Sequence, residues 1–291
     1  MTERSELPGQ AARHETSGAR LGRVFARARA ENRTALVVYL TALDPDFDTS
    51  RRLMLAAASA GADIIEIGIP WSDPSADGPA IQDAMQRALK AGGGLSRALE
   101  LCRAVRAENP ELGLVLFGYA NPIVVTGPIA FARRAREVGA DAVLCVDWPA
   151  DEAPELLSAL ADAGVGYIPL LAPTSTAPRV QIAASHARGF LYYVSMTGTT
   201  GVKINDLDGP RRQVAEIRAA SGNRHPIVVG FGITTPADAR AIASFADGVV
   251  VGSAAVRTVE AAVAAGRDPV PALSAFVRSL ADALGPSGRG T

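Results

Sequence analysis

Three of the four carboxylates in one short stretch of the chain are candidates for acid/base chemistry. Residues 62–79 read ADIIEIGIPWSDPSADGP, so Glu66 lies inside an apolar run and Asp73 and Asp77 lie in the loop that follows. Burial raises the pKa of a carboxyl group toward neutrality, which suits a proton donor or acceptor at physiological pH. We therefore expect Glu66 to be a catalytic acid or base. The alternative is a buried structural glutamate paired with an arginine or a backbone donor.

The alternation of side chains along a strand indicates where Glu66 points. Glu66 shares one face of its strand with Ile64 and Gly68, whereas the other face is all isoleucine. We expect the isoleucine face to pack against helices and Glu66 to point away from them. Gly68 should leave room for a ligand beyond the carboxyl group.

The two aspartates of the loop have less certain roles. Asp73 precedes Pro74, and an aspartate in such a position usually shapes a turn. Pro79 is expected to open a helix, because its missing N–H is harmless in the first helical turn. Asp77, just upstream, could cap that helix or bind a substrate.

The carboxylates need a scaffold, and the rest of the chain predicts one. Short apolar runs alternate with Ala/Leu/Arg segments of helical spacing, which is typical of a parallel sheet covered on both faces. Eight such units predict an α/β fold, a (β/α)8 TIM barrel with an extra N-terminal helix. We expect one domain over 20–284, a flexible tail over 1–19 and a frayed end over 285–291. The predicted strands are 35–42, 62–70, 112–120, 141–149, 166–173, 189–196, 226–233 and 248–256.

Active sites of such barrels lie at the C-terminal ends of the strands, where this chain carries small residues. The loops after the seventh and eighth strands contain Gly230, Gly232 and Gly252, and Ser253 could cap the next helix. GTTG at 198–201 adds further small residues after the sixth strand. Such loops predict a phosphate site, because backbone N–H groups can approach an anion closely. The alternative is that these glycines only permit tight turns.

Composition excludes several other classes of function. The formal net charge of −1 and the aromatic content of 5% give no basis for binding nucleic acid or an anionic membrane. The three histidines and two cysteines form no metal-ligand spacing and no Ser-His dyad. The N-terminus has no signal-peptide core, and its acidic residues argue against a transit peptide, so we expect a cytoplasmic protein.

Taken together, these blocks resemble the tryptophan synthase α subunit family from about residue 20 to 284. ADIIEIGIPWSDPSADGPAIQ is similar to that family's signature, and the supporting blocks follow in the family's order: TALDPD, GYANPI, CVDWP, LYYVSMTGTTG, VGFGIT and VVGSAAV. The resemblance implies a (β/α)8 barrel lyase. It would cleave indole-3-glycerol phosphate to indole and glyceraldehyde 3-phosphate by retro-aldol chemistry without a cofactor.

The resemblance also implies roles for individual residues. Glu66 would be the acid/base group that protonates the indole ring, Asp77 would bind the indole N–H, and Tyr192 would be the active-site tyrosine. The remaining implied site residues fall in two groups, the phosphate contacts Gly201, Gly232, Gly252 and Ser253 and the substrate-pocket residues Phe231, Tyr39, Tyr119 and Phe117.

The family implies a partner, the PLP-bearing β subunit that receives indole in an α2β2 complex. Four loop residues depart from the family's usual pattern, which would weaken that partnership: Leu43, Trp71, Ser75 and Thr199. Two alternatives to an α subunit therefore stay open. One is a stand-alone lyase that releases free indole, and the other is a catalytically weak barrel that binds and activates a partner enzyme.

Overall fold

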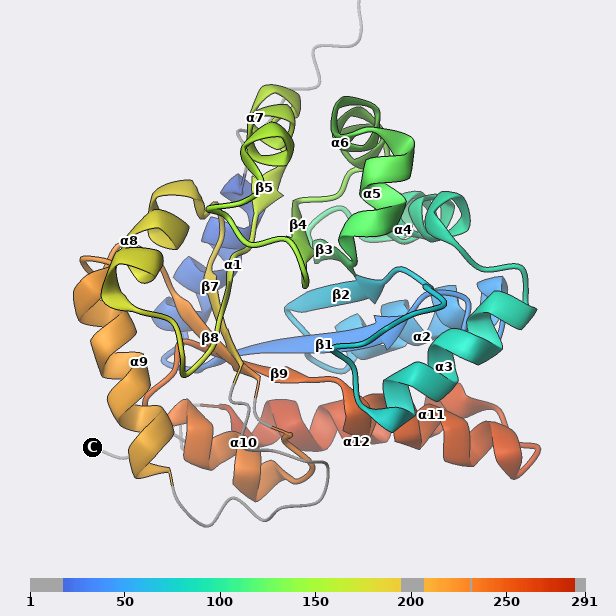
Figure 1. Ribbon diagram of the computed structural model, residues 1–291. Coiled ribbons are helices and arrows are strands. Elements are labelled where there is room, and N and C mark those ends of the chain that lie inside the picture. Colours follow the sequence, from blue (N-terminus) through green and yellow to red (C-terminus); the bar gives the residue numbers. More distant parts are fainter. Residues whose placement is uncertain (1–17, 195–206, 231, 286–291) are drawn as a thin grey trace, which may run out of the picture.

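The computed structural model describes residues 18–194, 207–230 and 232–285, and every strand pairing in them is parallel (Figure 1). Each strand lies within one of the eight predicted runs. The strands are β1 (Ala35–Thr41), β2 (Ile64–Gly68), β3 (Gly113–Gly118), β4 (Ala142–Cys145), β5 (Gly166–Tyr167), β6 (Leu170–Leu171), β7 (Leu191–Val194), β8 (Ile227–Gly230) and β9 (Gly248–Val251).

Helices follow the strands along the chain and surround the sheet (Figure 1). Among the described residues, none of them is long and apolar enough to span a membrane. The helices are α1 (Ala19–Ala30), α2 (Phe47–Ser59), α3 (Pro79–Lys90), α4 (Leu95–Glu108), α5 (Ala120–Thr126), α6 (Pro128–Glu137), α7 (Pro154–Ala163), α8 (Ala177–His186), α9 (Asp208–Ala220), α10 (Pro236–Ala243), α11 (Ser253–Ala264) and α12 (Pro269–Ala283).

The fifth predicted strand is split, and its two pieces close the ring. The sheet order is β5-β4-β3-β2-β1-β9-β8-β7-β6, so β5 and β6 stand at its two ends although they are adjacent in sequence. Between them, the Ile168 N–H donates to the Val143 carbonyl at 2.9 Å, and the Tyr192 N–H donates to the Pro169 carbonyl at 3.1 Å. Pro169 has no N–H to give to a ladder, which interrupts the strand. The predicted (β/α)8 barrel with its extra N-terminal helix is confirmed.

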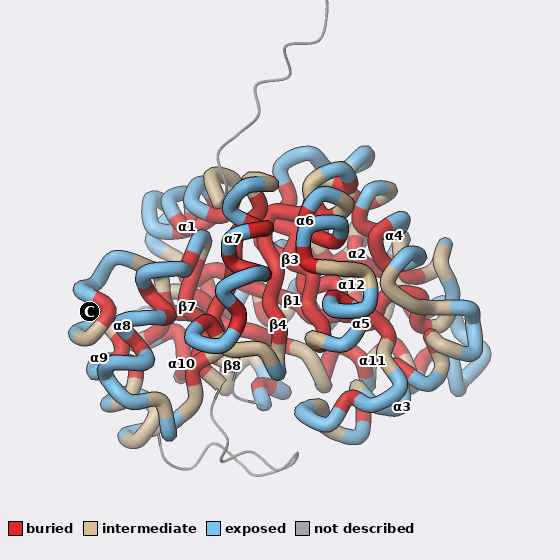
Figure 2. Tube along the Cα trace, turned by 45° about the horizontal axis from the view of Figure 1, so that its top comes forward, coloured by how far each residue is buried: buried red, intermediate tan, exposed pale blue. Residues whose placement is uncertain are grey.

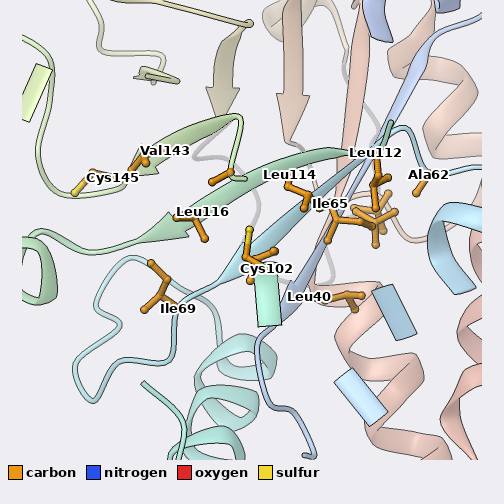
Figure 3. Close-up of a cluster of buried hydrophobic side chains, with 14 of the residues drawn as sticks. Leu40, Ala62, Ile65, Ile69, Cys102, Leu112, Leu114, Leu116, Val143 and Cys145 are labelled. Atoms are coloured by element: carbon orange, nitrogen blue, oxygen red, sulfur yellow. The ribbon is translucent and has the colours of Figure 1, made fainter. Parts of the chain in front are cut away.

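Two apolar layers hold the barrel together. The buried residues lie along the strands and on parts of the surrounding helices (Figure 2). The outer layer lies between strands and helices and includes Ile65, Leu114, Leu116 and Val143, with Cys102 of α4 among them (Figure 3). The inner layer fills the barrel and includes Ile64, Tyr39, Val115, Phe117, Phe190, Tyr192 and Val228. Ile64 inside and Ile65 outside confirm the predicted faces of β2.

Helix α1 closes the N-terminal end of the barrel. Its buried residues Leu21, Val24 and Phe25 belong to the inner layer. The Phe25 ring meets the ring of Phe190 edge to face at 5.7 Å, a favourable geometry for an aromatic pair. With this end covered, the opposite end carries the loops available for chemistry.

Three aspartates repeat one contact at the closed end. Each stands just before a strand and accepts the N–H of a residue in the neighbouring strand: Asp63 from Leu36 at 3.0 Å, Asp141 from Leu114 at 2.8 Å and Asp247 from Ile227 at 2.9 Å. Each also binds arginine: Asp63 binds Arg27 and Arg33, Asp141 binds Arg20 and Arg106, and Asp247 binds Arg218. These ion pairs fix strand registers far from the open end.

Candidate active site

Glu66 points into the barrel between two neighbours of the inner layer. In β2 it is paired in register with Tyr39 of β1 and Val115 of β3. Its side chain is fully buried, and neither carboxyl oxygen has a hydrogen-bond partner among the described residues. Burial alone raises the pKa of Glu66 to about 8, because an unpaired charge is poorly solvated there. The arginine or backbone donor of the structural alternative is absent from the described residues.

The space beyond Glu66 is occupied by Tyr39, contrary to expectation. A Cβ atom at Gly68 would lie 2.2 Å from the Tyr39 hydroxyl oxygen. Gly68 therefore makes room for the Tyr39 ring, and the prediction that it leaves room for a ligand is wrong. The tyrosine hydroxyl lies 3.3 Å from the Thr41 hydroxyl, and its ring meets Phe117 edge to face at 5.1 Å. Tyr39 and Phe117 thus form an aromatic wall beside Glu66.

Asp77 reaches the same region from the loop after β2. Its carboxylate accepts a hydrogen bond of 2.7 Å from the Tyr119 hydroxyl. The helix N-cap at this point is Gly78, with Pro79 as the first helical residue, so Asp77 does not cap α3. Asp73, by contrast, is exposed and binds the neighbouring Ser72 hydroxyl at 2.5 Å, as expected of a turn residue.

Tyr192 completes the buried polar group from the far side of the barrel. It lies on β7 and is 8% exposed. A Cβ atom at Gly230 would lie 2.6 Å from the Tyr192 hydroxyl oxygen. Burial first, and then the charges of Glu66 and Asp77, raise the pKa of Tyr192 well above its ordinary value.

Two of the predicted phosphate residues lie where α11 begins. Gly252 is the N-cap of this helix, and Ser253 is its first residue. No side chain caps the helix, so the prediction that Ser253 is the cap is wrong, and the predicted eighth strand ends at Val251 instead of residue 256. The open N–H groups of such a helix end favour an anion.

Gly232, after β8, is exposed with φ 60°. This left-handed backbone is open to glycine and strained for most other residues. Because β8 pairs with β9, Gly232 and Gly252 follow adjacent strands. Gly201 and Phe231, the other two residues predicted here, lie outside the described residues.

One polar residue of the site was not identified from the sequence. Asp147, in the loop after β4, accepts the Ala120 N–H at 2.7 Å and so holds the start of α5. Tyr119 is the residue just before this helix. The signal was available, since Asp147 stands at the C-terminal end of the fourth predicted strand, the end at which polar residues are candidates for function.

The arrangement gathers groups that can exchange protons and accept hydrogen bonds at one end of the barrel. Among the described residues, no group of three or more His, Cys, Asp or Glu side chains could hold a metal ion. The site instead combines a protonatable buried carboxyl group (Glu66), a hydrogen-bonded carboxylate (Asp77) and buried tyrosine hydroxyls at the C-terminal ends of parallel strands.

Comparison with known proteins places this chain in a family. Residues 25–285 match the family model described as tryptophan synthase alpha chain. The chain belongs to the tryptophan synthase alpha chain family. The resemblance drawn from the sequence blocks is confirmed.

Relatives and solved structures of the tryptophan synthase alpha chain family agree with this placement. The chain is 45% identical over 266 residues to the alpha chain of Phenylobacterium zucineum, covering 91% of this chain and 95% of the relative. It is 44% identical over 241 residues to that of Gluconacetobacter diazotrophicus, covering 83% and 87%.

The crystal structure of the alpha subunit from Legionella pneumophila superposes with a TM-score of 0.85 at 37% identity, covering 91% of this chain and 98% of that chain. A tryptophan synthase structure from Mycobacterium tuberculosis gives a TM-score of 0.83 at 35% identity, covering 93% and 99%.

At Leu43, one departure from the tryptophan synthase alpha chain pattern, the backbone has the conformation that suits glycine. Leu43 stands where the resemblance leads us to expect glycine, and its φ is 65°, in the region that glycine adopts freely. The side chain is buried and its N–H binds the Ser50 hydroxyl at 3.1 Å. The loop after β1 therefore keeps a glycine-type turn despite the leucine.

Proposed function

We propose that this chain cleaves indole-3-glycerol phosphate to indole and glyceraldehyde 3-phosphate as the α subunit of a tryptophan synthase. The observation that carries the proposal is the unpartnered carboxyl group of Glu66, buried at the catalytic end of a barrel whose family performs this reaction. Its pKa of about 8 keeps the group protonated at neutral pH, so it is ready to donate a proton.

The steps follow from the two carboxylic acids. Glu66 protonates C3 of the indole ring, which turns the ring into an electron acceptor. The glycerol hydroxyl next to the ring loses its proton to the Glu66 carboxylate so formed or to a water, and its carbon becomes the aldehyde. The C–C bond to C3 breaks, and its electrons restore the aromatic ring. Asp77 accepts the indole N–H and stabilises the positive charge that develops there.

The other predicted residues would hold the substrate. The aromatic wall of Tyr39 and Phe117, with Tyr119, Tyr192 and Phe231, would enclose the indole ring. The phosphate would bind at Gly201, Gly232, Gly252 and Ser253, fixing the other end of the substrate in register. We propose that 20–284 is a single domain carrying this whole site, with the tail and frayed end outside it, and that it acts in the cytoplasm with no cofactor of its own.

A direct assay tests the proposal. Purified chain, with and without an added tryptophan synthase β subunit, is given indole-3-glycerol phosphate, and indole release is measured. We expect slow release by the chain alone and a large rise with the partner. Fast release that the partner does not change would indicate a stand-alone lyase. Tight partner binding with no release in either case would indicate a barrel that only activates its partner.

We propose that the PLP-bearing β subunit docks on helices α5 and α6. Val124 and Val125 on α5 and Ile129 on α6 are 55%, 80% and 65% exposed. Large apolar side chains gathered on one surface are typical of interaction sites. Helix α5 begins where β3 ends, beside Tyr119 and Asp77, so a partner bound there would lie next to the site that releases indole. Tryptophan synthase structures are among this chain's structural neighbours.

A charged residue on this surface should uncouple the partner without harming the barrel. We expect Val125→Asp to weaken β-subunit binding at least tenfold and to remove most of the partner's stimulation, because an aspartate would be buried unpaired in the complex. Basal indole release should stay within twofold of wild type. Titration calorimetry and the coupled assay check this. The control is Ile182→Asp on α8, where an apolar residue is 41% exposed on another helix; an equal loss in both variants would contradict the assignment.

A further inference from the structure

A single phenol joins the Asp77 loop to the strand next to it. The Tyr119 hydroxyl donates to Oδ2 of Asp77 at 2.7 Å and accepts the N–H of Ala76 at 3.1 Å. The two bonds go to consecutive residues of the loop, one to a side chain and one to the backbone. Such a two-point contact fixes both the position of the loop and the rotation of the carboxylate.

Tyr119 is held by elements other than the loop it contacts. It follows β3, is the N-cap of α5 and is 2% exposed. The next N–H, that of Ala120, donates to the Asp147 carboxylate in the loop after β4 at 2.7 Å. The phenol is therefore positioned by β3, α5 and the β4 loop, so it can impose a geometry on Asp77.

The contact with Tyr119 occupies one of the two carboxylate oxygens of Asp77. The hydrogen bond from Tyr119 uses Oδ2, and a carboxylate can accept at both oxygens. The Asp77 backbone is held as well, since its carbonyl accepts the Gln82 side-chain amide at 2.8 Å and its N–H donates to the Pro74 carbonyl at 3.1 Å. With one oxygen and the backbone fixed, Oδ1 has a defined direction.

We propose that Tyr119 is the positioning residue for Asp77, whose hydroxyl holds the carboxylate so that Oδ1 accepts the indole N–H of the substrate. The role rests on the function proposed above. It differs from that of a pocket wall, because it is carried by the hydroxyl group and not by the ring.

The same hydrogen bond favours the charged form that this role requires. Burial raises the pKa of Asp77, and the bond from Tyr119 lowers it. The titratable groups that face Asp77 are Tyr119 from the end of β3, Tyr39 from β1 and Tyr192 from β7, with Glu66 of β2 facing the last two. Without the Tyr119 hydroxyl, the pKa of Asp77 should rise.

The test compares two tyrosines that each lose only a hydroxyl. We expect Tyr119→Phe to lower kcat/KM for indole release about 10- to 100-fold, as for a lost hydrogen bond to a charged group, and to move the acid limb of its pH profile to higher pH. The control is Tyr167→Phe: Tyr167 is 3% exposed and donates to the Trp148 carbonyl at 3.1 Å, with no contact to Asp77. Its rate should stay within twofold and its acid limb should not move.

A double variant shows whether Tyr119 acts through Asp77. In an Asp77→Ala background, Tyr119→Phe should lower kcat/KM less than twofold further, because effects that pass through one group are not additive. A full additional loss, or a Tyr119→Phe variant that behaves like Tyr167→Phe, would overturn the positioning role while leaving the lyase function intact. No indole release by wild type or Tyr167→Phe, with or without the β subunit, would overturn both proposals.

Discussion

Replacing Glu66 by glutamine is expected to reduce indole release about 10²- to 10⁴-fold, the range typical of a lost general acid. The amide has nearly the same shape but no acidic proton. The fold and the phosphate loops should be unaffected, so inhibition by inorganic phosphate should stay as in wild type. Steady-state and single-turnover release of indole would measure the loss.

The matched control lies a few residues further along the chain. Asp73→Asn makes the same chemical change in an exposed carboxylate that binds only the Ser72 hydroxyl among the described residues, and it should keep at least half of the wild-type rate. A near-wild-type rate in Glu66→Gln would remove Glu66 from the chemistry. In the wild type, turnover should decline as the pH rises past about 8, where the Glu66 proton is lost.

Glu66→Gln should also change how the free energy of unfolding depends on pH. In the unfolded chain Glu66 loses its proton near its ordinary pKa of 4.5, and in the folded chain near about 8. Between these values the folded state binds one more proton, so raising the pH favours unfolding, by about 1.4 kcal/mol per pH unit. Glu66→Gln lacks this dependence and should gain stability over wild type from pH 5 to pH 8 in urea titrations. A constant difference across that range would contradict the buried, neutral carboxyl group.

The second large effect is expected at the closed end of the barrel. Asp63→Ala should lower the free energy of unfolding by about 3–5 kcal/mol, as for a buried ion pair that loses one partner. Asp63 is 4% exposed and accepts two hydrogen bonds from Arg33, at 2.6 and 2.8 Å, one from Arg27 at 3.1 Å and one from the Leu36 N–H. Without it, the Arg33 guanidinium keeps its contact with Glu31 but loses two hydrogen bonds, and the Leu36 N–H of β1 loses its carboxylate acceptor. Urea denaturation at neutral pH would measure the change.

Asp247 provides the comparison for Asp63. Its side chain is 22% exposed and accepts from one arginine and one N–H, so Asp247→Ala should cost about 1–3 kcal/mol. Indole release per folded molecule should be unchanged in both variants, since both lie far from the open end. Equal destabilisation by the two substitutions would contradict the importance of burial at Asp63.

Much of the scaffold could be predicted because its signals are local. Near-continuous apolar runs marked every strand, and the period-two alternation around Glu66 gave the direction of its side chain without any tertiary information. Burial then follows from the fold, and the raised pKa from burial. The interruption at Pro169 was missed, because 166–173 was predicted as one strand, although a proline cannot supply a ladder hydrogen bond.

The contacts that the sequence left open join residues distant along the chain. Tyr119 meets Asp77 across two loops, and nothing in the spacing of 42 residues indicates that a phenol rather than a backbone group would hold the carboxylate. The Tyr39 ring fills the space over Gly68 because of its rotamer, which no periodicity encodes. Asp77 could have been a cap or a ligand from spacing alone, and the position of the N-cap at Gly78 removed the first choice.

The split fifth strand has a consequence for where the ring of strands opens locally. Its pieces are two residues long each, whereas β1 and β2, on the arc around Glu66, are seven and five residues long. In the ring order, the thin link lies opposite β1. Thermal opening should begin at the place with the fewest backbone hydrogen bonds. Flexibility is thus expected on the far side of the ring. Strand β2, which carries Glu66, lies in the arc with the longer strands, where the backbone should be most rigid.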